Sequence, residues 1–247
     1  MTKLSKKIDE ILKHSINKFD RPVNELIKEL KSEREKQFTN YNYWEDLESS
    51  DSECYFKFEE IANQSGHSID IQKLEYLETA LFIEDELFAL LEMKIIYAFK
   101  QLEINIKKII RHYYQELPNS KPKWHEIERF FKKQNIILNK IHGFQEVNEL
   151  RLVNNTLKHS DESIDETIMK IEEFKNSSIQ NIESLDKFYE RIEEFPALFI
   201  TSLMEIIEKE TSNFNQQKIE RIAKKATNRM DKDIAEKLII EIRKKYK

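Results

Sequence analysis

The sequence contains almost no glycine and little proline. Gly66 and Gly143 are the only glycines in 247 residues, and there are four prolines. Hairpin turns and the loops of α/β folds use both residue types heavily, because those turns need a positive or a fixed φ angle. Helices need few such residues. The scarcity therefore excludes most β-rich and α/β architectures and predicts an all-α fold.

The same scarcity excludes several kinds of site. Phosphate-binding loops need clustered glycines where backbone N–H groups approach the ligand, and the two glycines here are far apart. Cys54 is the single cysteine, so neither an internal disulfide nor a multi-cysteine zinc site can form. No pair of histidines has the spacing of metal ligands. We expect no metal and no other cofactor.

Long hydrophobic runs are also missing. The N-terminal segment MTKLSKKIDEILKHS places charge inside every apolar stretch, unlike a secretion signal or a membrane span. A lone cysteine fits a reducing compartment. We therefore expect a cytoplasmic protein with no membrane association.

Charges of the two signs are segregated along the chain. The net charge is −5, and residues 45–92 hold 14 acidic residues against Lys57 and Lys73. Residues 215–247 hold 11 basic residues against 5 acidic ones. The net charge alone therefore does not exclude a nucleic-acid partner.

Apolar residues recur at steps of three and four, which predicts amphipathic helices. Residues 70–117 lack glycine and proline and are too apolar for one narrow stripe, so we expect the central helix of a bundle, with a break near residues 82–86 left open. We predict an antiparallel helical bundle with N- and C-terminal helical extensions. Its parts are an N-terminal arm with an acidic connector (1–66), a core (67–212) and a basic C-terminal helix (213–247).

Interruptions of the pattern give finer expectations. Pro22 should bend or restart the first helix. Residues 39–68, rich in aromatic and acidic side chains, predict a connector and hinge between arm and core. The remaining expectations are a helix start at the capping box Ser163-x-x-Glu166, a kink at Pro196 in the run 185–210, and one basic helix over 217–246.

One predicted helix carries the residues that suggest chemistry. In FQEVNELRLVNNTLKH, the residues expected to face the core are Val147, Leu150, Val153 and Leu157. At about 100° per residue, another face collects Arg151, Asn154, Asn155, Lys158 and His159. Histidine can move protons near neutral pH, and Arg and Lys bind phosphate and stabilise developing charge. The stripe predicts phosphodiester chemistry without a metal; the alternative is an ordinary solvated helix face.

The segment ELRLVNNTLKH, residues 149–159, resembles the motif of the HEPN superfamily. In these helical bundles an Arg, a polar residue that is commonly Asn, and a downstream His lie on one core helix, and many members are metal-independent endoribonucleases of toxin, abortive-infection and CRISPR-associated systems. The resemblance implies catalytic roles for His159, Arg151 and Asn155, with Lys158 and Asn154 binding substrate. It also implies RNA as a partner, and a protein partner of a defence or toxin–antitoxin system is a further possibility.

The arginine departs from the family pattern. The family's Arg directly precedes the Asn, but that position holds Asn154, and Arg151 lies one turn earlier. Either Arg151 substitutes through its long side chain, or the site is degenerate and the chain is a non-catalytic helical interaction module. Acid–base cleavage needs two proton-moving groups, so we expect a homodimer in which a second His159 completes the site, as the resembled family builds it.

Overall fold

The structure is a computed structural model that describes residues 20–115, 117, 119, 121–159, 167–212 and 216–245. Within these ranges every regular element is a helix and no residue lies in a β-strand. The predicted all-α class is confirmed. By its internal contacts the chain divides into two compact units, residues 1–204 and 205–247.

The longest element of the first unit is α4, which runs unbroken from Ile69 to Tyr114. Its first turn is capped by Ser68, whose Oγ accepts a hydrogen bond from the N–H of Ile71. The helix continues through residues 82–86, where the sequence left a break open. Ile83 within this stretch and Leu87 directly after it are buried, and most of the stability of a helix in a protein comes from such tertiary packing.

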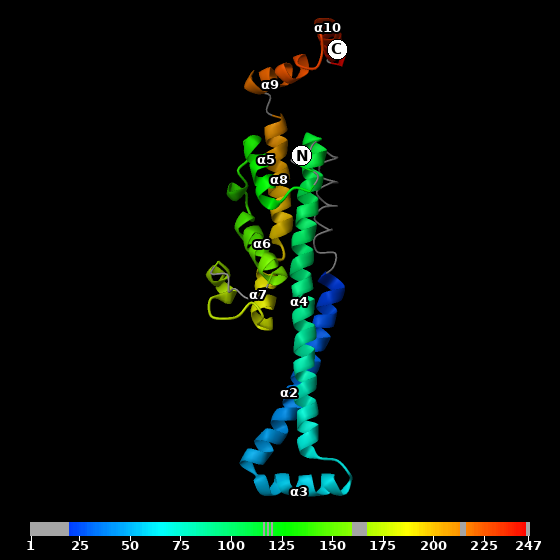
Figure 1. Cartoon of the computed structure of the whole chain (residues 1–247), viewed down its shortest axis with the longest axis vertical. Helices are drawn as coiled ribbons and strands as arrows, with labels where there is room; N and C mark the ends of the chain where they lie inside the picture. Colours follow the sequence, from blue (N-terminus) through cyan, green and yellow to red (C-terminus); the bar gives the residue numbers. More distant parts are fainter. Residues whose placement is uncertain are drawn as a thin grey trace. The chain divides into compact units, whose positions relative to one another are not determined.

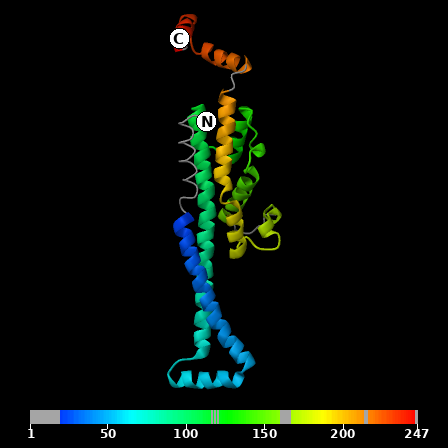
Figure 2. The same cartoon turned by 180° about the vertical axis from the view of Figure 1, so that it is seen from behind.

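Helices α2 (Asp20–Ser50) and α3 (Ser52–Gln64) precede α4. Figures 1 and 2 show α2 lying against the N-terminal half of α4 and running in the opposite direction, with α3 crossing near the end where the two are joined. Pro22 lies in the first turn of α2, where its missing N–H costs nothing. The part of the predicted first helix that precedes Asp20 lies outside the described residues.

Residues 39–68, predicted as a connector, are mostly helical. The chain leaves helical geometry only at Asp51 and over residues 65–68. Asp51 begins α3 because its Oδ1 accepts a hydrogen bond from the N–H of Cys54 at 3.0 Å. The acidic composition that suggested a connector instead marks solvated helix faces and a capping residue.

Helices α5 to α7 and the first turns of α8 lie along the C-terminal half of α4 (Figures 1 and 2). The elements are α5 (Trp124–Lys133), η1 (Leu138–Lys140), α6 (Phe144–Lys158), η2 (Ile168–Lys170), η3 (Glu172–Phe174), α7 (Ile182–Ile192) and α8 (Phe195–Ser212). Both α6 and α7 contact α4. The buried faces of these helices form the core that holds α6 in place.

Two expectations about helix ends change in this region. The run 185–210 is interrupted close to Pro196, but by a break between two helices and not by a kink within one: α7 ends at Ile192, and α8 begins at Phe195 with the proline in its first turn. The capping box Ser163-x-x-Glu166 lies outside the described residues. The chain that follows it forms the short 3-10 turns η2 and η3.

The second unit contains the end of α8, then α9 (Gln216–Thr227) and α10 (Lys232–Lys245). The single basic helix predicted over residues 217–246 is therefore wrong. The chain turns at residues 228–231, and Asp231 starts α10 by accepting a hydrogen bond from the N–H of Ile234 at 2.9 Å. Among the described residues, no helix combines the length and the apolar character needed to cross a membrane.

Candidate functional site

Helix α6 begins at a glycine that no other residue could replace without strain. Gly143 has a φ of 81°, in the left-handed region. A Cβ atom built there would lie 3.2 Å from the carbonyl oxygen of Phe195 and 3.4 Å from the backbone nitrogen of Phe199. This close approach seats the start of α6 against the first turns of α8.

The predicted core face of α6 is confirmed. Val147, Leu150 and Val153 have no exposed surface, and Leu157 is 5% exposed. The spacing of these residues fixes the rotation of α6 about its own axis. Every other side chain on the helix is placed by that rotation.

Four of the five stripe residues lie on the accessible side of α6. Arg151 is half-buried, and Asn155, Lys158 and His159 are exposed. His159 ends the helix, where its backbone N–H donates to the carbonyl oxygens of Asn155 and Thr156, both at 3.1 Å. Lys158 lies in the last turn, where the partial negative charge of the helix terminus favours a cation. We call these four residues the α6 stripe.

The fifth residue, Asn154, belongs to the core and not to the α6 stripe. It is 1% exposed. Its Nδ2 donates to Oδ1 of Asn155 at 3.0 Å, whereas its own Oδ1 has no hydrogen-bond partner among the described residues. At about 100° per residue, Asn154 lies between Leu150 and Val147 on the helix circumference. Asn154 could bind substrate, as predicted, only if the substrate reached a side chain that is almost fully buried.

Arg151 is held by a residue that the sequence did not single out. Its Nε and Nη2 both donate to Oδ1 of Asn148, at 3.2 and 2.9 Å. This contact within one turn orients the guanidinium along the helix. A residue three positions before a candidate arginine is the sequence signal that could have identified Asn148.

A charged cluster fixes the other flank of α6. Arg191 of α7 donates from Nη2 to Glu149 at 2.8 Å and from Nε to Glu173 at 2.6 Å. The hydrogen bond from Arg191 is the main reason that the pKa of the Glu173 carboxyl is lowered. These ion pairs join α6, α7 and η3, whereas Arg151 and Asn155 of the α6 stripe are hydrogen-bonded to asparagine side chains.

A second polar group, also missed by sequence reasoning, lies between α2, α4 and α7. Lys94 is 4% exposed, donates from Nζ to Oδ1 of Asn24 at 2.7 Å, and sits 4.2 Å above the ring of Tyr189. Burial lowers the pKa of Lys94 and, together with the nearby Asp20, raises that of Tyr189. The sequence signal that could have identified Lys94 is the presence of a lysine within the apolar run LLEMKIIYAF. The hydrogen bonds from Lys94 to Asn24 and from Tyr189 to Asp20 join the three helices, which is a structural role.

The fold and the stripe together define a general class. It is an all-α protein in which one core-packed helix presents Arg, Asn, Lys and His on its accessible side. Within the described ranges, no group of three His, Cys, Asp or Glu side chains is arranged to hold a metal ion. Comparison with known proteins found no matching family, curated protein or solved structure.

Proposed function

We propose that this chain is a HEPN-like, metal-independent endoribonuclease of a defence or toxin-type system. The observation that carries the proposal is the placement of the α6 stripe on the accessible side of a helix whose opposite face is buried. The four residues follow at positions i, i+4, i+7 and i+8. A helix seated by its apolar face keeps such side chains in a fixed order, as a preorganised phosphate site requires.

The proposed reaction is attack of a ribose 2′-hydroxyl on the adjacent phosphorus. One His159 imidazole accepts the proton of the 2′-hydroxyl, and the 2′-oxygen forms its bond to phosphorus. The bond from phosphorus to the 5′-oxygen breaks, and a second, protonated His159 donates its proton to that oxygen. The products are a 2′,3′-cyclic phosphate and a 5′-hydroxyl. Arg151 and Lys158 bind the phosphate oxygens, and Asn155 orients them.

The second histidine comes from a second copy of the chain. A two-fold axis beside α6 would bring the same stripe from both protomers to one cleft, because such an interface pairs a surface with itself. The cleft would collect several positive charges. Bound RNA phosphate offsets their repulsion, so substrate and dimer should stabilise each other.

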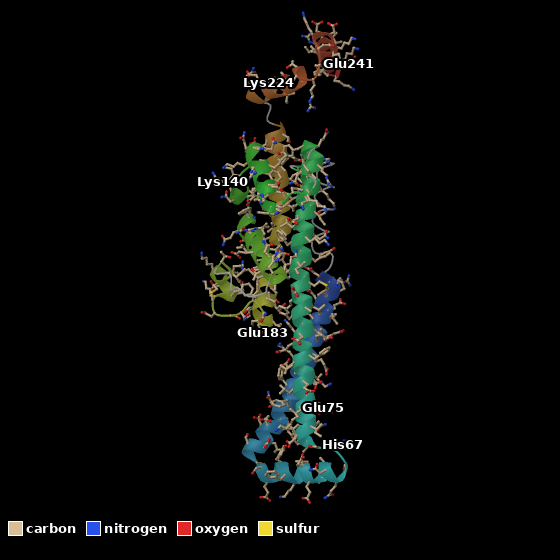
Figure 3. All side chains as sticks on the ribbon, in the orientation of Figure 1. His67, Glu75, Lys140, Glu183, Lys224 and Glu241 are labelled. Carbon is tan, nitrogen blue, oxygen red and sulfur yellow. The ribbon has the colours of Figure 1, made fainter. Side chains whose placement is uncertain are left out.

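The test is cleavage of single-stranded RNA in the presence of excess chelator. We expect the wild-type chain to cleave and His159→Ala to lose at least about 100-fold in rate, the usual scale for a general acid or base. Lys140→Ala, an exposed lysine on η1 labelled in Figure 3, is the matched control and should cleave normally. Both variants should keep the wild-type thermal unfolding curve. Cleavage that needs magnesium, or that ignores His159, contradicts the proposal.

The dimer has its own test. Inactive His159→Ala chains mixed with wild-type chains form mixed dimers that contain one intact histidine. Activity should then fall below the value expected from simple dilution of the wild type. If the activity falls only as much as dilution of the wild-type chains predicts, the site is not shared between two chains.

A second candidate function is a non-catalytic helical interaction module. It is favoured by the pairing of Arg151 with Asn148, because two of the guanidinium's N–H groups are already used within the helix. Asn148→Ala releases those groups. RNA cleavage that is absent from the folded wild-type chain and from folded Asn148→Ala would favour the interaction module over the nuclease.

A further inference from the structure

The loop end of the α2–α4 hairpin presents an acidic surface with unburied apolar side chains. We define the acidic tip as α3 together with residues 69–86 of α4. Its exposed large apolar residues are Phe56, Phe58, Ile61, Ile71, Leu74, Leu81 and Phe82. Acidic side chains lie among them, including the exposed Glu78 and Asp85 and the labelled Glu75 in Figure 3. A mixed acidic and apolar surface of this kind suits a basic, amphipathic partner.

Polar contacts join the helices of the acidic tip, and one of these apolar side chains, Phe58, also packs edge-on against Trp44 of α2 with the ring centroids 6.0 Å apart. Lys73 is buried and its Nζ donates to Glu45 and Glu48 of α2, at 2.5 and 2.6 Å. The hydroxyl of Tyr55 in α3 donates to Asp70 of α4 at 2.7 Å. The three helices are thus joined on their inner sides. The outer apolar side chains of α4 remain available to a partner.

The outer side chains on α4 lie along one line. At about 100° per residue, Ile71, Leu74, Leu81 and Phe82 fall on the side of α4 opposite to the buried Ala80, Ile83 and Leu87. Glu78 and Asp85 lie within the same exposed arc. A second helix is the element that fits such a line, because its own side chains recur with the same period.

The second unit ends in helices with the complementary character. We define the basic tail as α9 and α10. These two helices hold nine basic and four acidic residues, and no residue of α10 is buried. The exposed large apolar residues of the basic tail are Ile219, Ile222, Ile234, Leu238, Ile239, Ile240 and Ile242. Figure 3 labels Lys224 on α9 and Glu241 on α10.

We propose that the basic tail of one copy docks on the acidic tip of a second copy. Both surfaces carry unburied Ile, Leu or Phe side chains, and their charges are opposite. Two tips, or two tails, would repel each other, so the contact is directional and joins unlike surfaces. A head-to-tail contact of this kind forms a ring or an open chain of copies. The proposal does not depend on the nuclease.

The test is sedimentation of the full chain over a range of concentration and salt. We expect the average mass to rise above the 29.8 kDa of one chain as concentration increases at low salt, and to fall again at high salt because the charges are exposed. Two charge-reversed chains test the surfaces directly. One carries Glu78→Lys with Asp85→Lys in the acidic tip, and the other carries Lys224→Glu with Lys237→Glu in the basic tail.

Each reversed chain alone should lose tip–tail association by at least about tenfold in affinity. A mixture of the two should associate again, because the unchanged basic tail of the first chain can dock on the unchanged acidic tip of the second. Glu25→Lys with Glu29→Lys, two exposed positions far from the turn on α2, is the control with the same charge change and should associate like wild type. The proposed stripe dimer stops at two chains and does not respond to these reversals, so the two interfaces are distinguishable.

Several results would overturn the proposal. One is a wild-type chain whose average mass does not depend on concentration. This outcome includes a chain that remains monomeric and uses its basic tail to bind RNA or anionic vesicles. Another is association that both reversed chains retain. A third is a mixture of reversed chains that fails to associate while each is folded by circular dichroism.

Discussion

The hydroxyl of Tyr189 on α7 donates a hydrogen bond to Oδ2 of Asp20, the first residue of α2, at 2.7 Å. Both side chains are buried, although the residues are 169 positions apart in sequence. Lys94 of α4 lies over the same tyrosine ring. This hydrogen bond connects the start of α2 to the same core against which α6 packs.

Tyr189→Phe should lower the free energy of unfolding by about 1–3 kcal/mol, because it removes the tyrosine donor to the buried carboxylate of Asp20. Urea denaturation of the full chain measures the change. Tyr43→Phe, at a tyrosine that is 56% exposed, is the matched control and should have almost no effect. Equal losses in the two variants would mean that the hydrogen bond adds nothing.

Leu150→Asp should destabilise the fold by about 3–5 kcal/mol, because it places an unpaired charge in the buried face of α6. Asn155→Asp adds the same charge on the exposed side and should change the stability little. Thermal unfolding followed by circular dichroism compares them. A normal melting temperature for Leu150→Asp would show that the helix is rotated differently from the structure.

Much of the fold could be predicted because three/four spacing reports which side of a helix is buried. The core positions of α6 follow from that spacing, and the missing glycine and proline indicate helix over residues 70–117, although they left open the break that α4 does not have. Helix boundaries were harder. Composition made residues 39–68 resemble a connector, and Pro196 resembled a kink, because caps and first-turn prolines depend on local hydrogen bonds that composition does not reveal.

Asn154→Leu should raise the free energy of unfolding by about 1 kcal/mol. The substitution replaces the buried Oδ1 of Asn154, which accepts no hydrogen bond from the described residues, with an apolar side chain of similar size. Chemical denaturation measures the difference. Asn63→Leu, at an exposed asparagine on α3, is the control and should be close to neutral. Clear destabilisation by Asn154→Leu would show that the buried amide is satisfied in solution.

The burial of Asn154 could have been predicted from the sequence, whereas other features of the site could not. Its angle on the helix lies within the apolar arc, so spacing alone could have placed it in the core. The pairing of Arg151 with Asn148 was harder to foresee, since many polar residues compete for an arginine on a helix surface. The burial of Lys94 depends on α2 and α7, which are distant in sequence, and no local pattern could supply its partners.

Glu173→Gln should lower stability by about 1 kcal/mol at pH 7, a value kept small because Arg191 is partly exposed. The pKa of Glu173 is lowered in the folded chain from its ordinary value of 4.5. Its contribution is therefore complete above about pH 4.5 and is lost as the pH falls through the folded pKa. Thermal melts of both chains from pH 3 to pH 7 should converge at the acidic end. A constant difference across that range would contradict the ion pair.

The ends of the RNA fragments test the central claim most directly. After incubation with the wild-type chain in excess chelator, mass spectrometry of the fragments should find 2′,3′-cyclic phosphate on one side of each cut and 5′-hydroxyl on the other. These ends follow from attack by the 2′-hydroxyl with His159 moving the proton. His159→Ala should leave the RNA intact. Fragments with 5′-phosphate ends, or intact RNA with the folded wild-type chain, would contradict the proposed ribonuclease.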